Sequence, residues 1–395
     1  MKILVLNSGS SSLKFQLFEI KEKEDVLIKG IADGISSNNS FIKYEIKGRV
    51  KIIREKINGH KKALKNVLDI ILAKGIISSF NEINAIGHRA VHGGEDFKEP
   101  VIINNKVMKK IDELSSLAPL HNPANLMGMK VCNELLPNVK QVAVFDTGFH
   151  SNMPEKAFIY GIPYAYYKKY GIRHYGFHGT SHHYVSKKAA EILNKDYKKL
   201  KIISCHLGNG SSIAAVMNGK SIDTSMGFTP LEGVVMGTRC GDIDSAVILF
   251  LMKKEKLSVK EIDDILNKKS GLLGISGISP DVRVLWASEK KGNKRAGLTL
   301  DILGYRIAKY IGAYAAAMNG VDAIVFTAGI GENAFYVRER ILKQFEYIGL
   351  KLDKKKNQNN ETIITTDDSK VKAMVIPTNE ELQIARETFE LVKNK

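Results

Sequence analysis

The stretch KILVLNSGSSSLKFQLFEI, residues 2–20, decides the fold. Its apolar run Ile3–Leu6 predicts a buried strand, and the alternating apolar residues from Leu13 to Leu17 predict a second strand. The turn between them, Asn7–Ser12, is made of Gly and Ser after the asparagine. Backbone N–H groups and hydroxyls in such a turn can surround an anion, although an ordinary turn between two strands is the competing interpretation.

Two side chains beside this turn could take part in binding. Lys14 adds a positive charge that can reach a phosphate, and Asn7 ends the first strand, where it could bind an ion or its water. A related piece, KIISCHLGNGSSIAAVMN, recurs at Lys201–Asn218. There a predicted strand ends in His206–Ser212, and Asn218-Gly219 is a hairpin signal. Two such hairpins facing one nucleotide would make a two-domain phosphotransferase.

Length and charge limit the class of protein. A chain of 395 residues has room for two or three domains, and a hydrophobic content of 44% can form sizeable cores. The formal net charge of +17 suits an anionic partner, including nucleic acid. The lysines are scattered, however, without aromatic residues between them, so we interpret most of them as solvated surface and expect no nucleic-acid partner.

The cysteines and the apolar runs indicate where the protein works. Cys132, Cys205 and Cys240 are odd in number and have no metal-type spacing, which favours reduced thiols. The first apolar run, from Ile3, is too short for the core of a signal peptide, and Ala246–Met252 is too short to span a bilayer. We therefore expect a soluble, cytoplasmic protein without a membrane partner.

Charged residues lie near the ends of two further predicted strands. Ile83–Val91 is followed by Gly93-Gly94, which leaves Arg89 accessible, either as an anion-binding residue or as a surface arginine. Gln141–Phe145 reads as a buried strand, and Asp146 follows it directly. An acid at the carboxyl end of a strand lies where α/β sheets usually bind ligands, but it could also cap the next segment.

The composition shifts to Pro and Tyr between Ser151 and Tyr170, so we place a domain boundary near residue 148. The segment RHYGFHGTSHH, Arg173–His183, then precedes a predicted helix that begins near Ser181. Its histidines fit no common metal spacing. His178 stands at a Gly-bounded turn and is better placed as a hydrogen-bond donor.

Two later segments carry further candidates. The Gly- and Thr-rich stretch Asp223–Asp244 is expected to be ordered by contacts to a ligand, with Arg239 as its working residue. The loop Ser279–Arg283 opens a predicted helix. Asp281 and Arg283 could hold a ribose or base edge, and a simple N-cap is the alternative.

The last third of the chain adds a nucleotide-type turn and a candidate metal ligand. The predicted strand Asp322–Phe326 runs into the glycine turn Thr327–Asn333 and a helix, which is the general shape of a nucleotide site. Neither a full dinucleotide fingerprint nor a Walker A motif occurs, so we exclude Rossmann and P-loop proteins. Lys351–Asn360 is predicted to be a solvated polar loop, and Ala118–Pro123 is predicted to be a stiff loop that could form a pocket wall. Glu380, after the final strand, is either a Mg²⁺ ligand or a capping carboxylate.

Together these motifs resemble the acetate kinase (acetokinase) family, of the sugar kinase/Hsp70/actin superfamily. The resemblance covers essentially the whole chain, in the family's order and without a departure at a motif position. It rests on NSGSSSLK (7–14), GHRAVHGG (87–94), FDTGFH (145–150), YGFHGTSH (175–182), HLGNGSS (206–212), MGTRCGDID (236–244), SPDVR (279–283), GIGEN (329–333) and PTNEE (377–381).

The resemblance implies a two-lobed, duplicated ribonuclease-H-like (actin-like ATPase) α/β fold, with a mixed sheet in each domain and an active-site cleft between the domains. Residues 1–148 would form the N-terminal domain, with a C-terminal helix at 381–395 packing on it. Residues 149–380 would form the C-terminal domain. The resemblance also implies a homodimer.

It further implies a role for each matching residue. Asn7 and Glu380 would ligate Mg²⁺, which Mn²⁺ could replace. Arg89, Arg239, His178 and Asp146 would be catalytic, with Asp146 as a proton donor or acceptor. The nucleotide would be held by Lys14, His206, Leu207, Gly208, Asn209, Gly210, Asp281, Val282, Arg283, Gly329, Ile330, Gly331, Glu332 and Asn333. The acyl substrate would be bound by Arg89, Val91, Leu120, Phe177 and Pro230.

The implied reaction is the reversible, direct in-line transfer of the ATP γ-phosphoryl group to acetate, which gives acetyl phosphate and ADP. This transfer joins two anions, so positioning and charge neutralisation by Arg89, Arg239 and Mg²⁺ are the main catalytic tasks. A carboxylic acid with a pKa of roughly 4–5 is already ionised at neutral pH and needs no base. We therefore expect Asp146 to orient Arg89 or the Mg²⁺ shell.

Two alternatives remain at this point. A propionate or butyrate kinase would use the same machinery. A nucleotide-switched, actin-like interaction module would need the nucleotide residues but not Arg89, Arg239 and the apolar pocket, whose presence argues against it.

Overall fold

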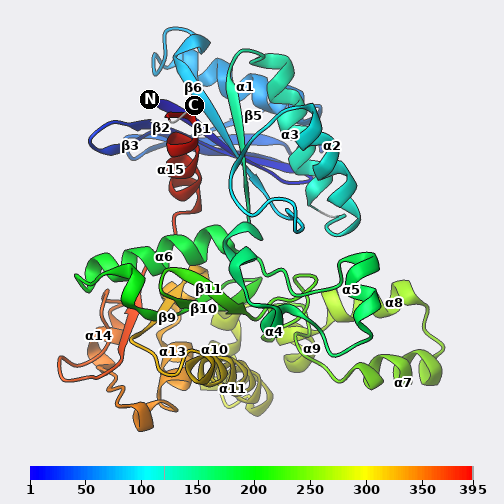
Figure 1. The fold of residues 1–395 in the computed structure, drawn as a ribbon, viewed down its shortest axis with the longest axis vertical. Coiled ribbons are helices and arrows are strands. Elements are labelled where there is room, and N and C mark those ends of the chain that lie inside the picture. The colour runs from blue at the N-terminus through cyan, green and yellow to red at the C-terminus, as the bar shows by residue number, and fades with distance from the viewer. Residues whose placement is uncertain (120, 394–395) are drawn as a thin grey trace. The chain divides into compact units, whose positions relative to one another are not determined.

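The structure, a computed structural model, describes residues 1–119 and 121–393 and divides into two compact units. Unit 1 comprises Met1–Phe149 and Asn379–Lys395, and unit 2 comprises His150–Thr378. Each unit is an α/β body built on one mixed sheet (Figure 1). Every described helix is too short or too polar to cross a membrane.

The sheet of unit 1 has eight strands in the order β5-β4-β3-β2-β1-β6-β8-β7. β1 to β5 pair antiparallel in succession, whereas β6 pairs with β1 and β8 with β6 in parallel. The strands are β1 (Lys2–Ser8), β2 (Ser12–Ile20), β3 (Glu24–Asp33), β4 (Phe41–Ile46), β5 (Arg49–Arg54), β6 (Ile83–Ala90), β7 (Val101–Ile102) and β8 (Lys140–Phe145).

Helices cover both faces of this sheet. Leu4 and Leu6 of β1 belong to the core that the sheet forms with α1 (Gly59–Ala73) and α3 (Asn122–Leu135). Ile3 and Val5 pack on the other face against α15 (Glu380–Lys393). Because successive strand residues point to opposite faces, a continuous apolar run is what a strand buried on both faces requires. A further helix, α2 (Asn105–Glu113), packs beside α3.

The sheet of unit 2 repeats the centre of the first one. Its order is β11-β10-β9-β12-β13, with two antiparallel pairs followed by two parallel pairs. This is the pattern of β3-β2-β1-β6-β8 in unit 1, so the predicted duplication is confirmed. The strands are β9 (Lys201–Leu207), β10 (Ser211–Met217), β11 (Lys220–Thr224), β12 (Ala323–Thr327) and β13 (Lys372–Val375).

Alternate residues of β9 divide the two faces of the second sheet. Ile203, Cys205 and Leu207 pack in the core with the long helix α11. Ser204 and His206 point to the other face, where they bond to α6. The helices of unit 2 are α4 (Glu155–Phe158), α5 (Tyr164–Tyr170), α6 (Gly179–Ile192), α7 (Ser245–Glu255), α8 (Val259–Asp264), α9 (Gly271–Ser276), α10 (Val282–Lys290), α11 (Lys294–Ala317), α12 (Ala328–Asn333), α13 (Phe335–Leu342) and α14 (Lys354–Gln358).

Three segments differ from the sequence-based expectation. Ala118–Pro123 is not loop throughout, because α3 begins at Asn122 with proline in its first turn. The stretch 329–333 is itself helical, as α12, rather than a glycine turn. Lys351–Asn360 contains α14, whose Asn357 is buried.

The polar segment around α14 is ordered by a buried arginine. Arg338 Nε donates to Asn357 Oδ1 at 2.8 Å, and its Nη2 donates to the Asn357 carbonyl at 2.7 Å. A buried guanidinium needs such acceptors, because leaving its N–H groups unpaired is costly. Tertiary contact therefore fixes a segment whose composition suggested solvation.

Candidate active site

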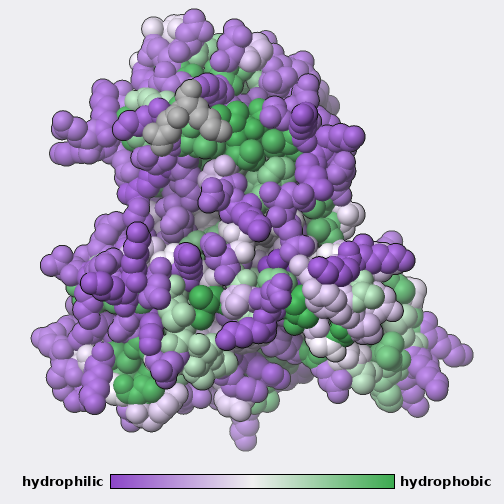
Figure 2. Space-filling model, in the orientation of Figure 1, coloured by the Kyte–Doolittle hydropathy of each residue, from purple (hydrophilic) through white to green (hydrophobic). Residues whose placement is uncertain are grey.

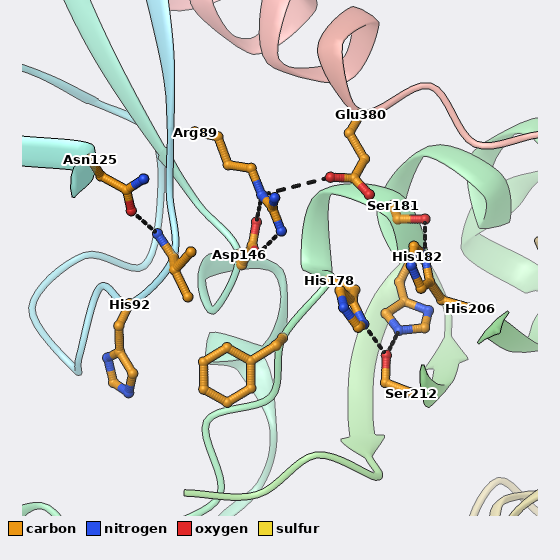
Figure 3. A network of polar contacts seen from close by, with 12 residues as sticks. Arg89, His92, Asn125, Asp146, His178, Ser181, His182, His206, Ser212 and Glu380 are labelled. Atoms are coloured by element: carbon orange, nitrogen blue, oxygen red, sulfur yellow. Dashed lines mark hydrogen bonds and ion pairs between the residues drawn. The ribbon is translucent and has the colours of Figure 1, made fainter. Parts of the chain in front are cut away.

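In unit 1, two charged side chains pair near the ends of neighbouring strands. Arg89 lies near the end of β6, and Asp146 directly follows β8, the parallel partner of β6. Arg89 Nε donates to Asp146 Oδ1 at 3.0 Å, and Nη2 donates to Oδ2 at 2.7 Å (Figure 3). Such a bidentate contact fixes the plane of the guanidinium. Arg89 is thus a partly buried, oriented side chain and not a solvated surface arginine.

A second carboxylate, Glu380, lies 3.7 Å from Arg89 Nε at the start of α15 (Figure 3). The capping contact there comes from Asn379, whose Oδ1 accepts from the backbone N–H of Leu382 at 3.0 Å. Burial raises the pKa of Glu380, Arg89 opposes the rise, and the charge of Asp146 adds to it. Lys14 also opposes the rise, so Glu380 lies among two cationic side chains and a second carboxylate.

The predicted magnesium ligands are of a suitable chemical type. Asn7, in β1, lies opposite Lys14 of β2 in the sheet register. An amide oxygen from Asn7 and a carboxylate from Glu380 are ligand types that Mg²⁺ accepts. Within the described part of the chain, no three His, Cys, Asp or Glu residues are arranged to hold a metal by themselves. Mg²⁺ commonly keeps waters and substrate phosphates as its other ligands, so this sparse donor set suits it.

Two asparagines that the sequence analysis did not single out hold the loop after β6. Asn125 Oδ1 accepts from the backbone N–H of Val91 at 3.1 Å. Asn122 Oδ1 accepts from His92 N at 3.1 Å, and Asn122 Nδ2 donates back to the His92 carbonyl at 3.0 Å. Their spacing, three residues apart on one helix, was the available signal. Leu120, predicted for the same pocket as Val91, lies outside the described residues.

In unit 2, the hairpin turn between β9 and β10 forms a tight, glycine-lined corner. Gly208 N donates to the Gly210 carbonyl at 3.1 Å. The neighbouring Asn209 carbonyl accepts from Gly237 N at 3.3 Å, which joins the corner to the segment that carries Arg239. A β-carbon on Gly237 would lie 2.3 Å from Asn209 Oδ1, so the Asn209 side chain would have to move to admit one.

The predicted catalytic groups of unit 2 converge on Gly210. A β-carbon at Gly210 would lie 3.4 Å from Nη1 of Arg239 and 3.6 Å from Nε2 of His178. The two side chains therefore border the same small space above a glycine. An anion in this space could be reached by a guanidinium and by an imidazole.

Arg239 is held without a carboxylate. Its Nη1 donates to the Pro230 carbonyl at 3.0 Å and lies 3.6 Å from Met236 Sδ. Across the described residues, these are its side-chain partners, and no ion pair is among them. Burial lowers the pKa of Arg239, which reflects a charge that is desolvated and left uncompensated.

His178 sits at the start of α6 with an unusual backbone. It is the N-cap residue, with a left-handed φ of 57°, a conformation that is uncommon outside glycine and is found at functional sites. Its ring stacks on His206, with centroids 4.1 Å apart. Its Nδ1 lies 2.8 Å from Ser212 Oγ (Figure 3). Phe177, predicted for the acyl pocket, is 2% exposed.

The remaining predicted nucleotide residues of unit 2 lie at the start of α10 and in α12. Asp281 caps α10, accepting from Arg283 N at 2.8 Å, so its capping role is confirmed and a nucleotide contact stays a prediction. Asp281 also pairs with the exposed Arg283 side chain at 2.6 Å. In α12, Glu332 Oε1 accepts from Ala328 N at 2.8 Å. A β-carbon on Gly208 would lie 3.9 Å from that of Ala328, which places the start of α12 beside the hairpin.

Comparison with known proteins identifies the family. The model of the acetokinase family matches residues 2–386. The chain is 56% identical over 399 residues to acetate kinase of Halothermothrix orenii, covering 100% of each. It is 58% identical over 400 residues to acetate kinase of Carboxydothermus hydrogenoformans, again covering 100% of each. The chain therefore belongs to the acetokinase family, of phosphotransferases that act on a carboxyl group.

Solved structures agree in fold over the same length. The crystal structure of Porphyromonas gingivalis acetate kinase matches with a TM-score of 0.94 at 46% identity, covering 99% of each chain. A propionate kinase from Francisella tularensis matches with a TM-score of 0.92 at 44% identity, covering 98% of this chain and 99% of that one. The predicted two-domain α/β fold with two mixed sheets is confirmed.

Proposed function

We propose that this protein is an acetate kinase, which reversibly transfers the γ-phosphoryl group of Mg-ATP to acetate to give acetyl phosphate and ADP. The observation that carries the proposal is the pair of differently held arginines, Arg89 beside two carboxylates and Arg239 beside His178. Joining two anions requires positive charge and fixed geometry more than covalent chemistry. Full-length similarity to acetate kinases supports the choice of substrates.

Unit 2 supplies the groups for the phosphoryl group in transit. Arg239 would neutralise its developing charge, since the guanidinium borders Gly210 and has no carboxylate partner in the described structure. His178 would donate from Nε2 to an equatorial oxygen of the same group. The hairpin corner His206–Gly210 would hold the nucleotide phosphates through its backbone.

Unit 1 supplies the groups for the carboxylate substrate and the metal. Arg89, oriented by Asp146, would bind the acetate carboxylate in a bidentate manner. Asp146 would act as a positioning residue, because acetate is already ionised at neutral pH. Mg²⁺, held by Asn7 and Glu380, would supply positive charge to the phosphate oxygens of ATP.

The predicted apolar pocket favours acetate only weakly over the next longer acid. Val91, Phe177 and Pro230 are the described members of the predicted apolar pocket, and one methylene in such a pocket changes binding by only about 1–3 kcal/mol. The similarity to a propionate kinase makes propionate the second candidate substrate.

Trapping of the acyl phosphate with hydroxylamine tests the proposal. Purified protein is incubated with Mg-ATP and acetate, propionate or butyrate in parallel, and the hydroxamate is measured. Controls lack ATP, lack Mg²⁺, or contain Arg239→Ala. Product greatest with acetate supports the proposal, and product greatest with a longer acid transfers the assignment to that acid. ATP binding without any hydroxamate would indicate a nucleotide-switched interaction module instead.

We also propose that the protein works in the cytoplasm as a homodimer, through the surface of α7 and α8. All residues of α7 are described and none is buried, although its sequence is SAVILFLMKKE. Leu249 and Phe250 are 69% and 63% exposed, and Val259 at the start of α8 is 76% exposed. Figure 2 shows hydrophobic residues at the surface over this region. An apolar helix without cover is typical of an interaction surface.

Light scattering after size-exclusion chromatography tests the dimer. The wild-type protein is expected at twice the monomer mass, and Phe250→Glu is expected to shift it toward the monomer. Val50→Glu, a change at an equally apolar exposed site of β5 (51% exposed), is the control and should leave the mass unchanged. A wild-type monomer at micromolar concentration would contradict the proposal.

A further inference from the structure

A chain of hydrogen bonds runs from the sheet of unit 2 to His178. Ser204 Oγ of β9 lies 2.9 Å from His182 Nδ1, and His182 Nε2 lies 2.8 Å from Ser212 Oγ of β10. Ser212 Oγ in turn lies 2.8 Å from His178 Nδ1 (Figure 3). His182 is four residues after His178, on the same face of α6. Ser204, His182 and Ser212 are fully buried.

We propose that Ser204, His182 and Ser212 form a hydrogen-bond chain of fixed direction, which holds His178 as the neutral tautomer with its proton on Nε2. These residues would be positioning residues that act through His178. The inference rests on the proposed function for what the Nε2 proton does, namely donate to an oxygen of the transferring phosphoryl group.

His182 is the neutral link of this chain. Burial lowers the pKa of His182 well below its usual value, and the nearby His150 and His206 lower it further. A neutral imidazole carries one N–H donor and one acceptor nitrogen. His182 must therefore donate to one serine and accept from the other.

Ser204 decides the direction. In the described structure its hydroxyl has one hydrogen-bond partner, His182 Nδ1, and it has no access to solvent. If Ser204 accepted this bond, its own hydroxyl hydrogen would be buried without an acceptor, which is unfavourable. Ser204 therefore donates to Nδ1, and the proton of His182 is on Nε2.

The remaining protons follow from this assignment. His182 Nε2–H donates to Ser212 Oγ, so the single hydroxyl hydrogen of Ser212 is left to donate to His178 Nδ1. His178 then carries its proton on Nε2, the nitrogen that borders Gly210 together with Arg239.

Nitrogen-15 NMR of the histidine rings tests the tautomer directly. Wild-type protein is expected to show His178 protonated at Nε2 and bare at Nδ1. Ser212→Ala removes the donor to Nδ1 and is expected to give a mixture of tautomers. Ser204→Ala, which does not touch His178, should shift the mixture in the same direction but less. Ser186→Ala removes a buried hydroxyl from the same helix, bonded to Tyr197, and should change nothing.

Kinetics separate positioning from a merely structural effect. Ser212→Ala is expected to lower kcat by about 10–100-fold, with KM for ATP and acetate within twofold, because proton placement matters in the transition state. Ser204→Ala should lower kcat by less, and Ser186→Ala should leave it unchanged.

Two outcomes overturn different claims. An unchanged His178 tautomer in Ser212→Ala, with kcat within twofold of wild type, would overturn the hydrogen-bond chain while leaving the proposed function intact. If Ser212→Ala does not fold, the same criterion applies to Ser204→Ala. Absence of acyl phosphate with the wild-type enzyme would overturn the proposed function, and the tautomer measurement would still test the chain.

Discussion

Arg89 of unit 1 and Arg239 of unit 2 are held in opposite ways. In unit 1, Arg89 contacts Asp146 in a bidentate manner and has Glu380 at 3.7 Å. In unit 2, Arg239 has a backbone carbonyl at 3.0 Å and a thioether as its partners among the described residues. Burial alone would lower the pKa of Arg89, but its two carboxylates raise it, whereas burial lowers the pKa of Arg239 without opposition.

The two settings suit the two arginines to different anions. The charge of Arg89 is compensated, so we propose that its role is geometric, because the carboxylates set the plane of the guanidinium before a substrate arrives. The charge of Arg239 is uncompensated, so an arriving anion gains the full benefit of it. The surrounding groups differ in the same sense, since carboxylates lie beside Arg89 in unit 1 and His178 borders the same space as Arg239 in unit 2.

Loss of the uncompensated charge should have the largest effect. Arg239→Ala is expected to lower kcat by about 10³–10⁵, the range typical of an arginine that stabilises a transferring phosphoryl group. Arg239→Lys should recover only part of the rate, because an ammonium lacks the planar fork of a guanidinium. Initial rates of hydroxamate formation measure both. A kcat of Arg239→Ala within tenfold of the wild-type value would contradict the proposed role of the Arg239 charge.

The pH dependence of the free energy of unfolding should show that His88 of unit 1 is buried in its neutral form. Burial lowers the pKa of His88 from 6.5 to about 4, partly opposed by its bond to Gln141. Between these values the unfolded chain binds more protons than the native one, so stability is present above pH 6.5 and is lost as the pH falls toward 4. The loss from His88 is about 3 kcal/mol. Denaturant unfolding at pH 7 and 4.5 should therefore show a smaller pH dependence for His88→Gln than for wild type, and equal dependence would contradict this.

Removal of the Asp146 charge beside Arg89 should lower the catalytic rate moderately. Asp146→Asn keeps the shape but weakens the bidentate contact, so we expect kcat to fall about 10–100-fold and KM for acetate to rise. The pH–rate profile should keep all its limbs, because Asp146 orients Arg89 and does not carry the reacting proton. Loss of one limb of the pH–rate profile in Asp146→Asn would instead support a role of Asp146 as proton donor or acceptor. Exposed Asp112→Asn is the matched control and should behave as wild type.

The smallest expected effect concerns the metal. Glu380→Gln removes the negative charge of the side chain and keeps its size. About tenfold more Mg²⁺ should therefore be needed for half-maximal rate. Saturating Mg²⁺ should restore most of the activity. Asp146→Asn, tested in parallel, should keep the wild-type Mg²⁺ requirement. Equal Mg²⁺ curves for Glu380→Gln and wild type would remove Glu380 from the metal site.

Local patterns in the sequence were enough to predict most of the sheet cores and both hairpins. Apolar runs such as Ile3–Leu6 and turn signals such as Asn218-Gly219 act over a few residues, and the structure follows them. β3 was not predicted, because its ends are polar and its pairing with β2 and β4 is what orders it. α14 was mistaken for a loop, because the buried Arg338 that holds it is distant in sequence.

In the candidate site, too, individual residues could be predicted from the sequence, whereas the contacts that hold them could not. Arg89, Asp146 and Arg239 could be singled out, because each follows or lies within a segment whose glycines and strand ends are visible in the sequence. The bonds that orient them could not be read from the sequence. Ser204 and Ser212 meet His182 only when β9 and β10 pair and α6 covers them. The alternation of the polar residues Ser204 and His206 within a buried strand was the one local signal that polar groups pack on that face of the sheet.

The most direct test of the central claim, that Arg239 keeps its charge for the γ-phosphoryl group, is calorimetric titration of Arg239→Ala with ATP and with ADP. ATP is expected to bind Arg239→Ala about tenfold more weakly than wild type, whereas the dissociation constant of ADP is expected to be unchanged, since only ATP carries the group that Arg239 would contact. Arg89→Ala should leave both constants unchanged. Equal weakening of ATP and ADP, or no weakening of either, would contradict the claim.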